Sequence, residues 1–130
     1  MCGFIGSISK DPISYTDLNI ANQYIVCRGP DKNIFYNNEN KKFKNNLNKF
    51  FHFEFNRLSI LDLSEMANQP MYSESSDNLL MFNGEIFNHH KLRKELESSG
   101  VVFNTNHSDT EVILNGLTKF GLDFIKKLNG

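Results

Sequence analysis

The sequence contains no tryptophan, only two cysteines and three prolines, and no apolar run near the roughly 20 residues that a membrane-spanning helix needs. Two cysteines are too few for a disulfide scaffold, so the expected compartment is the reducing cytoplasm. The N-terminal stretch has neither a basic flank nor a long apolar segment, so it does not resemble an export signal. The 14 Lys and Arg residues nearly balance the 15 Asp and Glu residues, which argues against a nucleic-acid partner held by bulk charge. We therefore predict a cytoplasmic protein that binds neither nucleic acid nor a membrane.

The composition that is present favours a folded domain. Hydrophobic residues make up 39% of the 130 residues and charged residues 22%, which is enough apolar material for a core. Twelve phenylalanines predict a Phe-rich interior. Residues 37–49 are polar, basic and low in complexity, so we expect them to form a solvated surface loop.

The first half of the chain alternates strand and helix patterns. The segment Gly3–Ser9 alternates small and apolar residues and predicts a buried strand. Residues 16–27 predict a helix that stops at Gly29-Pro30. Its inward-facing residues would be Leu18, Ala21 and Ile25. A short strand is expected at residues 33–36.

Phenylalanines at every second position from Phe51 to Phe55 predict a half-buried strand. Strict alternation would then place Arg57 on the same face as the phenylalanines. Either a bulge near residue 56 resets the alternation, or Arg57 points inward for a reason.

The second half predicts one strand and two helices, with a brief strand between the helices. The apolar run at residues 79–82 predicts a strand covered on both faces. A helix is expected over residues 89–99 with Asn88 as its cap, then a brief strand at 101–103 and a last helix opening at residues 108–111. The inward-facing residues of these helices would be Leu92, Leu96, Ile113, Leu117 and Phe120.

Cys2 is the first candidate for chemistry. A cysteine is most often a small buried hydrophobe, but removal of Met1 would give Cys2 both a thiol and a free α-amine. An α-amine titrates close enough to neutral pH to accept a thiol proton, so such a residue needs no catalytic histidine.

Other polar residues have both a structural and a functional interpretation. Asn83-Gly84 is a turn signal, but its carboxamide and glycine N–H could also form an oxyanion hole. An inward Arg57 suits a carboxylate ligand. Asp109 and Glu111 fit a capping box, or with Glu85 a site for an ammonium group.

Metal and nucleotide sites have no support in the sequence. His89, His90 and His107 lack metal-ligand spacing, so we expect them to be exposed. No glycine-rich phosphate loop is present. Cys27, beside Arg28, is expected to pack at a helix end.

Six stretches, in this order, span nearly the whole chain: Met1-Cys2-Gly3-Phe4-Ile5-Gly6, Arg28-Gly29-Pro30-Asp31, Arg57-Leu58-Ser59-Ile60 with Asp62, Gln69-Pro70, Phe82-Asn83-Gly84-Glu85-Ile86-Phe87-Asn88 and Ser108-Asp109-Thr110-Glu111-Val112-Ile113-Leu114. Together they resemble the glutaminase domain of asparagine synthetases, a class II glutamine amidotransferase of the N-terminal nucleophile hydrolase type. The Arg-Gly-Pro-Asp stretch favours this branch over the amidotransferases that make glucosamine phosphate or purine precursors. One departure is Phe55-Asn56, where family members often carry a second basic residue or a histidine.

The resemblance implies catalytic roles for three residues. Cys2, freed of Met1, would attack the side-chain amide carbon of glutamine while its own α-amine manages the protons. Asn83 and the Gly84 N–H would hold the oxyanion as ammonia leaves and again as water hydrolyses the thioester to glutamate.

The resemblance also implies how glutamine binds. Arg57 would hold its α-carboxylate, and Asp109 and Glu85 its α-ammonium. The backbone of four further residues would help at the carboxylate: Leu58, Ser59, Ile60 and Leu61. No metal and no cofactor are expected in this chain.

The resemblance further implies an α+β fold, an αββα sandwich whose final strands are not contained in residues 1–130. The chain would be a C-terminally truncated part of the amidotransferase domain, and a synthetase domain that uses ATP and Mg²⁺ would normally follow in the same chain. In the full-length enzyme the ammonia would convert aspartate to asparagine. Two alternatives stay open: a catalytically inactive fragment, and a subunit completed by a partner that amidates another carboxylate.

Overall fold

The computed structural model describes residues 2–37, 49–73, 75 and 78–130, and these residues contain both helices and strands, as expected for an α+β chain. They form two compact units, Met1–Ser59 and Ile60–Gly130. Most of the predicted surface loop, residues 38–48, lies outside the described residues.

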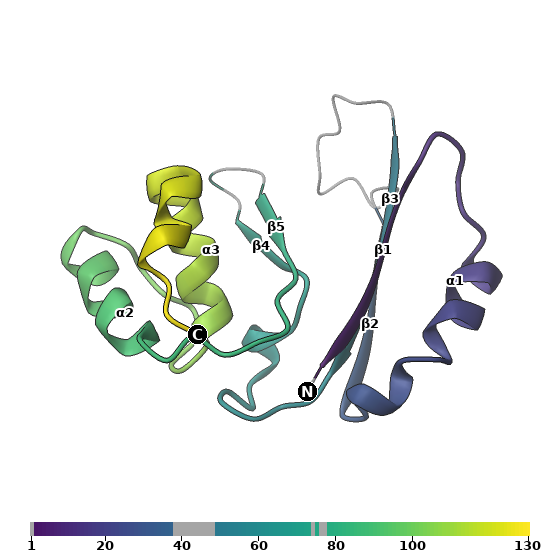
Figure 1. Cartoon of the computed structure of the whole chain (residues 1–130), viewed down its shortest axis with the longest axis horizontal. Helices are drawn as coiled ribbons and strands as arrows, with labels where there is room; N and C mark the ends of the chain where they lie inside the picture. The colour runs from purple at the N-terminus through teal and green to yellow at the C-terminus, as the bar shows by residue number, and fades with distance from the viewer. Residues whose placement is uncertain (1, 38–48, 74, 76–77) are drawn as a thin grey trace. The chain divides into compact units, whose positions relative to one another are not determined.

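The described residues of the first unit build an antiparallel sheet of three strands with one α-helix. The strands are β1 (Gly3–Ser9), β2 (Lys32–Asn37) and β3 (Phe50–Arg57), in the order β1-β3-β2. Helix α1 (Tyr15–Asn22) lies on one face of this sheet (Figure 1). The predicted strands at Gly3–Ser9 and 33–36 are confirmed, but the expected burial of Gly3–Ser9 is wrong, because Phe4, Gly6 and Ile8 are exposed.

The helix predicted over residues 16–27 is shorter than expected. Helix α1 ends at Asn22, and a separate 3₁₀ turn, η1 (Val26–Arg28), follows. Leu18 is buried as predicted, but Ala21 is exposed and Ile25 is only partly buried. The apolar residues at helical spacing therefore extend beyond Asn22, the last residue of the helix.

Strand β3 is regular up to its last residue. Asn56 pairs with Gly3 of β1, and Arg57 pairs with Lys32 of β2, with no residue skipped in either register. The bulge interpretation is therefore wrong. Arg57 lies on the same face of the strand as Phe55 and is 6% exposed, so its side chain is buried and does not point to solvent.

The face of β3 opposite Phe55 is buried although it is polar. His52, Glu54 and Asn56 are at most 3% exposed, because α1 covers this face. Asn22 of α1 donates from Nδ2 to Glu54 Oε1 at 2.6 Å, and its Oδ1 accepts from Asn56 Nδ2. Asn33 of β2 donates a further hydrogen bond to Glu54 Oε1 at 2.8 Å. A buried polar network thus joins the helix to the sheet, beside the buried Leu18 and the contact of Tyr15 with Phe35.

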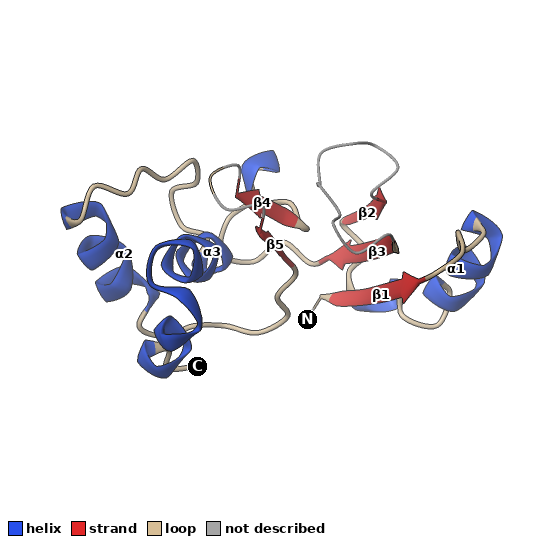
Figure 2. Ribbon diagram, turned by 90° about the horizontal axis from the view of Figure 1, so that it is seen from above, coloured by secondary structure: helices blue, strands red, loops and turns tan. Residues whose placement is uncertain are grey.

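The described part of the second unit contains a strand pair and helices. Strand β4 (Met71–Ser73) pairs antiparallel with β5 (Asn78–Leu80). The helices are η3 (Glu65–Ala67), α2 (His89–Ser98), α3 (Asp109–Phe120) and η4 (Gly121–Lys127). Figure 2 shows α2 beside α3. The strand predicted at 79–82 is shorter, because it ends at Leu80, and Leu79 and Leu80 are only partly buried.

An apolar core holds the second unit together. Its buried members come from α2, α3, η4 and the segment before α2: Ile86, Leu92, Leu96, Val112, Ile113 and Phe124. The predicted helices over 89–99 and from residue 109 are confirmed, with Gly100 at a φ of 89° after the first. Leu117 packs against the core as expected, whereas Phe120 is 47% exposed.

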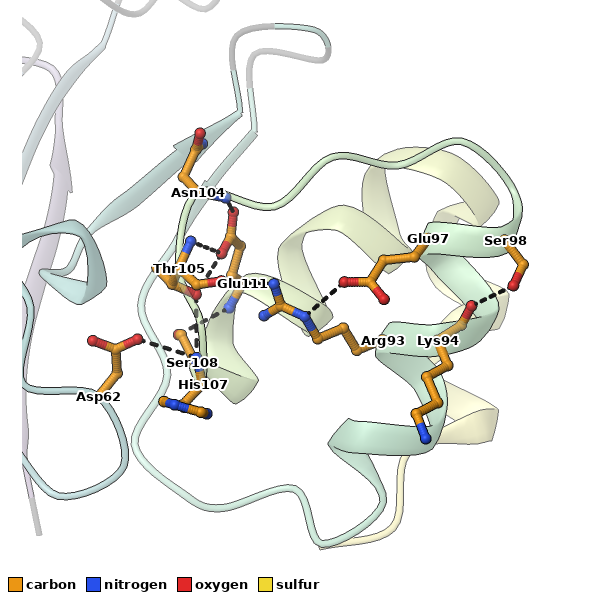
Figure 3. A network of polar contacts seen from close by, with 10 residues as sticks. All are labelled: Asp62, Arg93, Lys94, Glu97, Ser98, Asn104, Thr105, His107, Ser108 and Glu111. Carbon is orange, nitrogen blue, oxygen red and sulfur yellow. Dashed lines mark hydrogen bonds and ion pairs between the residues drawn. The ribbon is translucent and has the colours of Figure 1, made fainter.

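The strand predicted at residues 101–103 is absent. Polar side chains from both helices fix this connection instead (Figure 3). The Glu111 carboxylate accepts from the backbone N–H groups of Asn104 at 2.7 Å and Thr105 at 2.8 Å. Arg93 donates from Nη2 to Thr105 O at 2.7 Å and lies 4.1 Å from the centroid of the Phe103 ring. These side-chain contacts hold the connection in place without the backbone pairing of a strand.

Candidate active site

In the first unit, Cys2 lies immediately before β1 and next to the segment that follows β3. The Leu58 N–H donates to Cys2 Sγ at 3.3 Å, and Sγ is 3.5 Å from Leu58 O. Arg28 donates from Nε to Cys2 O at 3.1 Å. Cys2 is partly buried. The sheet therefore brings the predicted nucleophile to one of the predicted glutamine-binding backbone residues.

The Arg-Gly-Pro-Asp stretch holds the end of β3 in place. Asp31 accepts the Ser59 N–H at Oδ2 (2.7 Å) and donates its own N–H to Arg57 O at 3.0 Å. A Cβ added to Gly29 would lie 2.1 Å from Asn56 O, so only glycine permits this close approach. Asp31 was not among the predicted site residues, although its motif gave a signal for it.

An open surface cavity of about 390 Å³ adjoins this region; it is lined by Cys27, Arg28, Pro30 and Leu58, and of these only Leu58 was a predicted site residue. Small-molecule sites commonly measure about 300–1,000 Å³. Cys27 is exposed, so the expectation that it packs at a helix end is wrong.

In the second unit, the predicted oxyanion residues lie on an irregular segment. Asn83, Gly84 and Glu85 are exposed and follow β5 without a second strand after them, so Asn83-Gly84 is not a hairpin turn. The structure brings Asp109 to this segment, because its Oδ2 accepts the Ile86 N–H at 3.0 Å.

Glu111 has a structural role. Ser108 caps α3 by accepting the Glu111 N–H at 3.2 Å, as the capping box predicts. The Glu111 carboxylate does not return to Ser108, because it binds Asn104 and Thr105 (Figure 3). Its oxygens are therefore occupied by protein donors.

The remaining predicted residues are placed as follows. Leu58 and Ser59 are partly buried in the first unit, whereas Ile60 and Leu61 are 69% and 38% exposed in the second. His89 is buried, with Nδ1 2.7 Å from Ile86 O, so its predicted exposure is wrong. His90 and His107 are exposed.

The described residues contain no group of three His, Cys, Asp or Glu residues able to hold a metal ion. Within the same residues, every helix is too short or too polar to cross a membrane.

Comparison with known proteins gives the class. The family model described as the glutamine amidotransferase domain matches residues 1–130, so the chain belongs to that family. It is 38% identical over 135 residues to the glutamine-hydrolysing asparagine synthetase 1 of Bacillus subtilis, and 35% identical over 147 residues to a putative asparagine synthetase of Methanocaldococcus jannaschii. Both matches cover 100% of this chain but only 20% and 26% of the relatives, so the chain spans about a fifth to a quarter of their length. The resemblance stated from the sequence is confirmed.

Proposed function

We propose that this chain hydrolyses glutamine to glutamate and ammonia, with Cys2 as an N-terminal nucleophile. The observation that carries the proposal is the position of Cys2 at the edge of the sheet, where its Sγ meets the backbone of Leu58 beside a cavity. Family membership supports the reaction class.

The proposed reaction starts when Met1 has been removed. The Cys2 sulfur forms a bond to the side-chain amide carbon of glutamine, and the thiol proton passes to the α-amine of the same residue. The C–N bond then breaks, and ammonia leaves with that proton. Water attacks the resulting thioester, which releases glutamate and restores the thiol.

Asn83 and the Gly84 N–H hold the oxyanion that forms in both halves of this reaction. Both residues are exposed, and their segment is not paired in a sheet, so their donors are available to a ligand. Loss of one such donor typically lowers the rate by about 10²–10³-fold.

Arg57 binds the α-carboxylate of glutamine, helped by the backbone of residues 58–61, and Glu85 and Asp109 bind the α-ammonium. The regular register that turns Arg57 inward supports the first assignment. The Asp109 contact with Ile86 N–H, next to Glu85, supports the second.

The domain is the N-terminal part of an αββα sandwich of the N-terminal nucleophile hydrolase type. In the whole protein, a synthetase domain uses ATP and Mg²⁺ to activate aspartate, and the ammonia converts it to asparagine. The length of the relatives supports a further domain. The glutaminase step consumes only glutamine and water and needs no cofactor.

The proposal is tested by treating the full-length protein with an electrophile that mimics glutamine. We expect one covalent adduct, located at Cys2 by peptide mass spectrometry, and release of glutamate from glutamine. Cys2→Ala should abolish both, and Cys27→Ala should change neither.

Three outcomes would overturn the proposal. Labelling at Cys27 would place the nucleophile elsewhere. A chain that retains Met1 and still hydrolyses glutamine would exclude the α-amine as proton acceptor. A processed Cys2 with neither labelling nor hydrolysis would indicate a catalytically inactive fragment or a subunit that needs a partner.

A further inference from the structure

The Gln69-Pro70 motif has no role in the reaction as proposed, yet Gln69 is buried, with 8% of its surface exposed. Both polar atoms of its carboxamide form hydrogen bonds. The carboxamide oxygen Oε1 accepts the Phe82 N–H at 2.6 Å. The nitrogen Nε2 donates to Thr110 Oγ1 at 3.2 Å. Gln69 therefore ties the segment before Asn83 to the first turn of α3.

The same turn of α3 holds the other end of that segment. Asp109 Oδ2 accepts the Ile86 N–H at 3.0 Å, and Asp109 is next to Thr110 in the chain. The backbone is thus held at residue 82 by Gln69 and at residue 86 by Asp109. Asn83, Gly84 and Glu85 lie between these two anchors.

The anchored segment has no other regular support. It follows β5 and precedes α2 without belonging to either. A backbone N–H can hold an oxyanion only if its direction is fixed, because misplacement of a reacting group by about 1 Å can cost about 100-fold in rate. Two buried polar side chains supply that fixation here.

We infer that Gln69 is a positioning residue for the glutaminase reaction: its carboxamide orients the Asn83-Gly84 oxyanion donors through the Phe82 N–H and is itself oriented by Thr110. This inference rests on the proposed function. Gln69 touches neither glutamine nor the reacting atoms.

The experiment compares the Gln69→Met variant of the full-length protein with the wild type. Methionine keeps the length of the side chain but loses both hydrogen bonds. We expect kcat for glutamine hydrolysis to fall by about 10- to 100-fold, with KM changed by less than about threefold, because the lost interaction acts in the transition state. The matched control is Gln23→Met, since Gln23 is exposed at the end of α1, and it should leave kcat unchanged.

A second reagent separates positioning from a general structural effect. Alkylation of Cys2 by iodoacetamide displaces iodide at carbon and develops no oxyanion, so its rate should be the same in Gln69→Met and wild type. A parallel fall in both rates would show that the variant damages the fold and would overturn the inference. A Gln69→Met variant with wild-type kcat would overturn it as well.

If Gln69→Met does not fold, two variants of Thr110 provide a second test. Thr110→Val removes the hydroxyl that Gln69 contacts, whereas Thr110→Ser keeps it. We expect Thr110→Ser to retain more kcat than Thr110→Val, and equal values would contradict the inference. A wild type without glutaminase activity or Cys2 labelling would instead overturn the proposed function, so the two failures are distinguishable.

Discussion

The two units of the chain are stabilised by different forces. In the described residues of Met1–Ser59 the buried hydrophobic side chains are Leu18 and Phe55, and α1 is fastened by the polar network of Asn22, Asn33, Glu54 and Asn56. The second unit, Ile60–Gly130, contains two apolar clusters: the core around α2 and α3, and a smaller one of Ala67, Met71 and Leu114, against which Leu80 of β5 packs.

This difference matches what each unit contributes to the proposed reaction. The first unit holds Cys2 directly before β1 of a regular sheet, where the Leu58 N–H contacts its Sγ and Arg28 Nε contacts its carbonyl oxygen. The second unit carries the oxyanion donors on an irregular segment, so buried side chains must orient that segment. Directional polar contacts fix geometry, whereas apolar burial supplies most of the stability.

The largest expected effect on stability lies in the apolar unit. Leu96→Ala removes a side chain that is 0% exposed in the core between α2 and α3. We expect the free energy of unfolding to fall by about 2–5 kcal/mol, because the truncation loses apolar burial and leaves a cavity. Urea unfolding followed by far-UV circular dichroism measures it.

The matched control is Leu122→Ala, since Leu122 is 79% exposed in the same unit. It should change the free energy of unfolding by no more than about 0.5 kcal/mol. Equal losses in the two variants would show that this core does not carry the stability of the unit.

A smaller loss is expected from the polar network. Asn22→Ala leaves Asn56 Nδ2, on a residue that is 0% exposed, without its acceptor, and removes one donor from Glu54. An unsatisfied buried group costs about 1–3 kcal/mol, so the free energy for opening α1, measured by amide hydrogen exchange, should fall by that amount. Asn19→Ala, on the exposed side of α1, is the control and should not lower it. An Asn22→Ala variant as stable as wild type would mean that the network is not needed to hold α1.

The burial of this polar network could not be predicted from the sequence pattern. Alternation predicted a strand from Phe51 to Phe55, within the observed β3, and put Arg57 on the phenylalanine face, as found. It could not show that His52, Glu54 and Asn56 are buried, because period-two reasoning assigns the polar face to solvent. Only the tertiary placement of α1 covers that face.

Long-range polar contacts explain the other differences. The spacing correctly predicted α2, α3 and the Ser108 cap, since those depend on local signals. Residues 101–103 have apolar strand-like character, but the carboxylate of Glu111 and the guanidinium of Arg93 fix this connection. The motifs predicted Cys2 and Arg57 as site residues, whereas the role proposed for Gln69 rests on its contacts with Phe82 and Thr110, which the sequence does not reveal.

The smallest expected effects come from the two helix caps, one in each unit. Ser108 accepts the Glu111 N–H at 3.2 Å and is buried, whereas Ser14 accepts the Asp17 N–H at 3.1 Å and is exposed. Removal of a cap costs about 1 kcal/mol. For Ser108→Ala this loss should appear in the urea midpoint, because α3 is part of the apolar core.

For Ser14→Ala the loss should remain local, because α1 has only eight residues and buries only Leu18 and Asn22. Amide hydrogen exchange is the appropriate measurement: protection should fall within α1 and stay unchanged in β1 and β3. Ser98→Ala, whose hydroxyl bonds only the Lys94 carbonyl, is the control for both caps and should alter neither observable. Loss of protection throughout the sheet in Ser14→Ala would contradict the distinction, because it would make α1 part of a single cooperative unit with the strands.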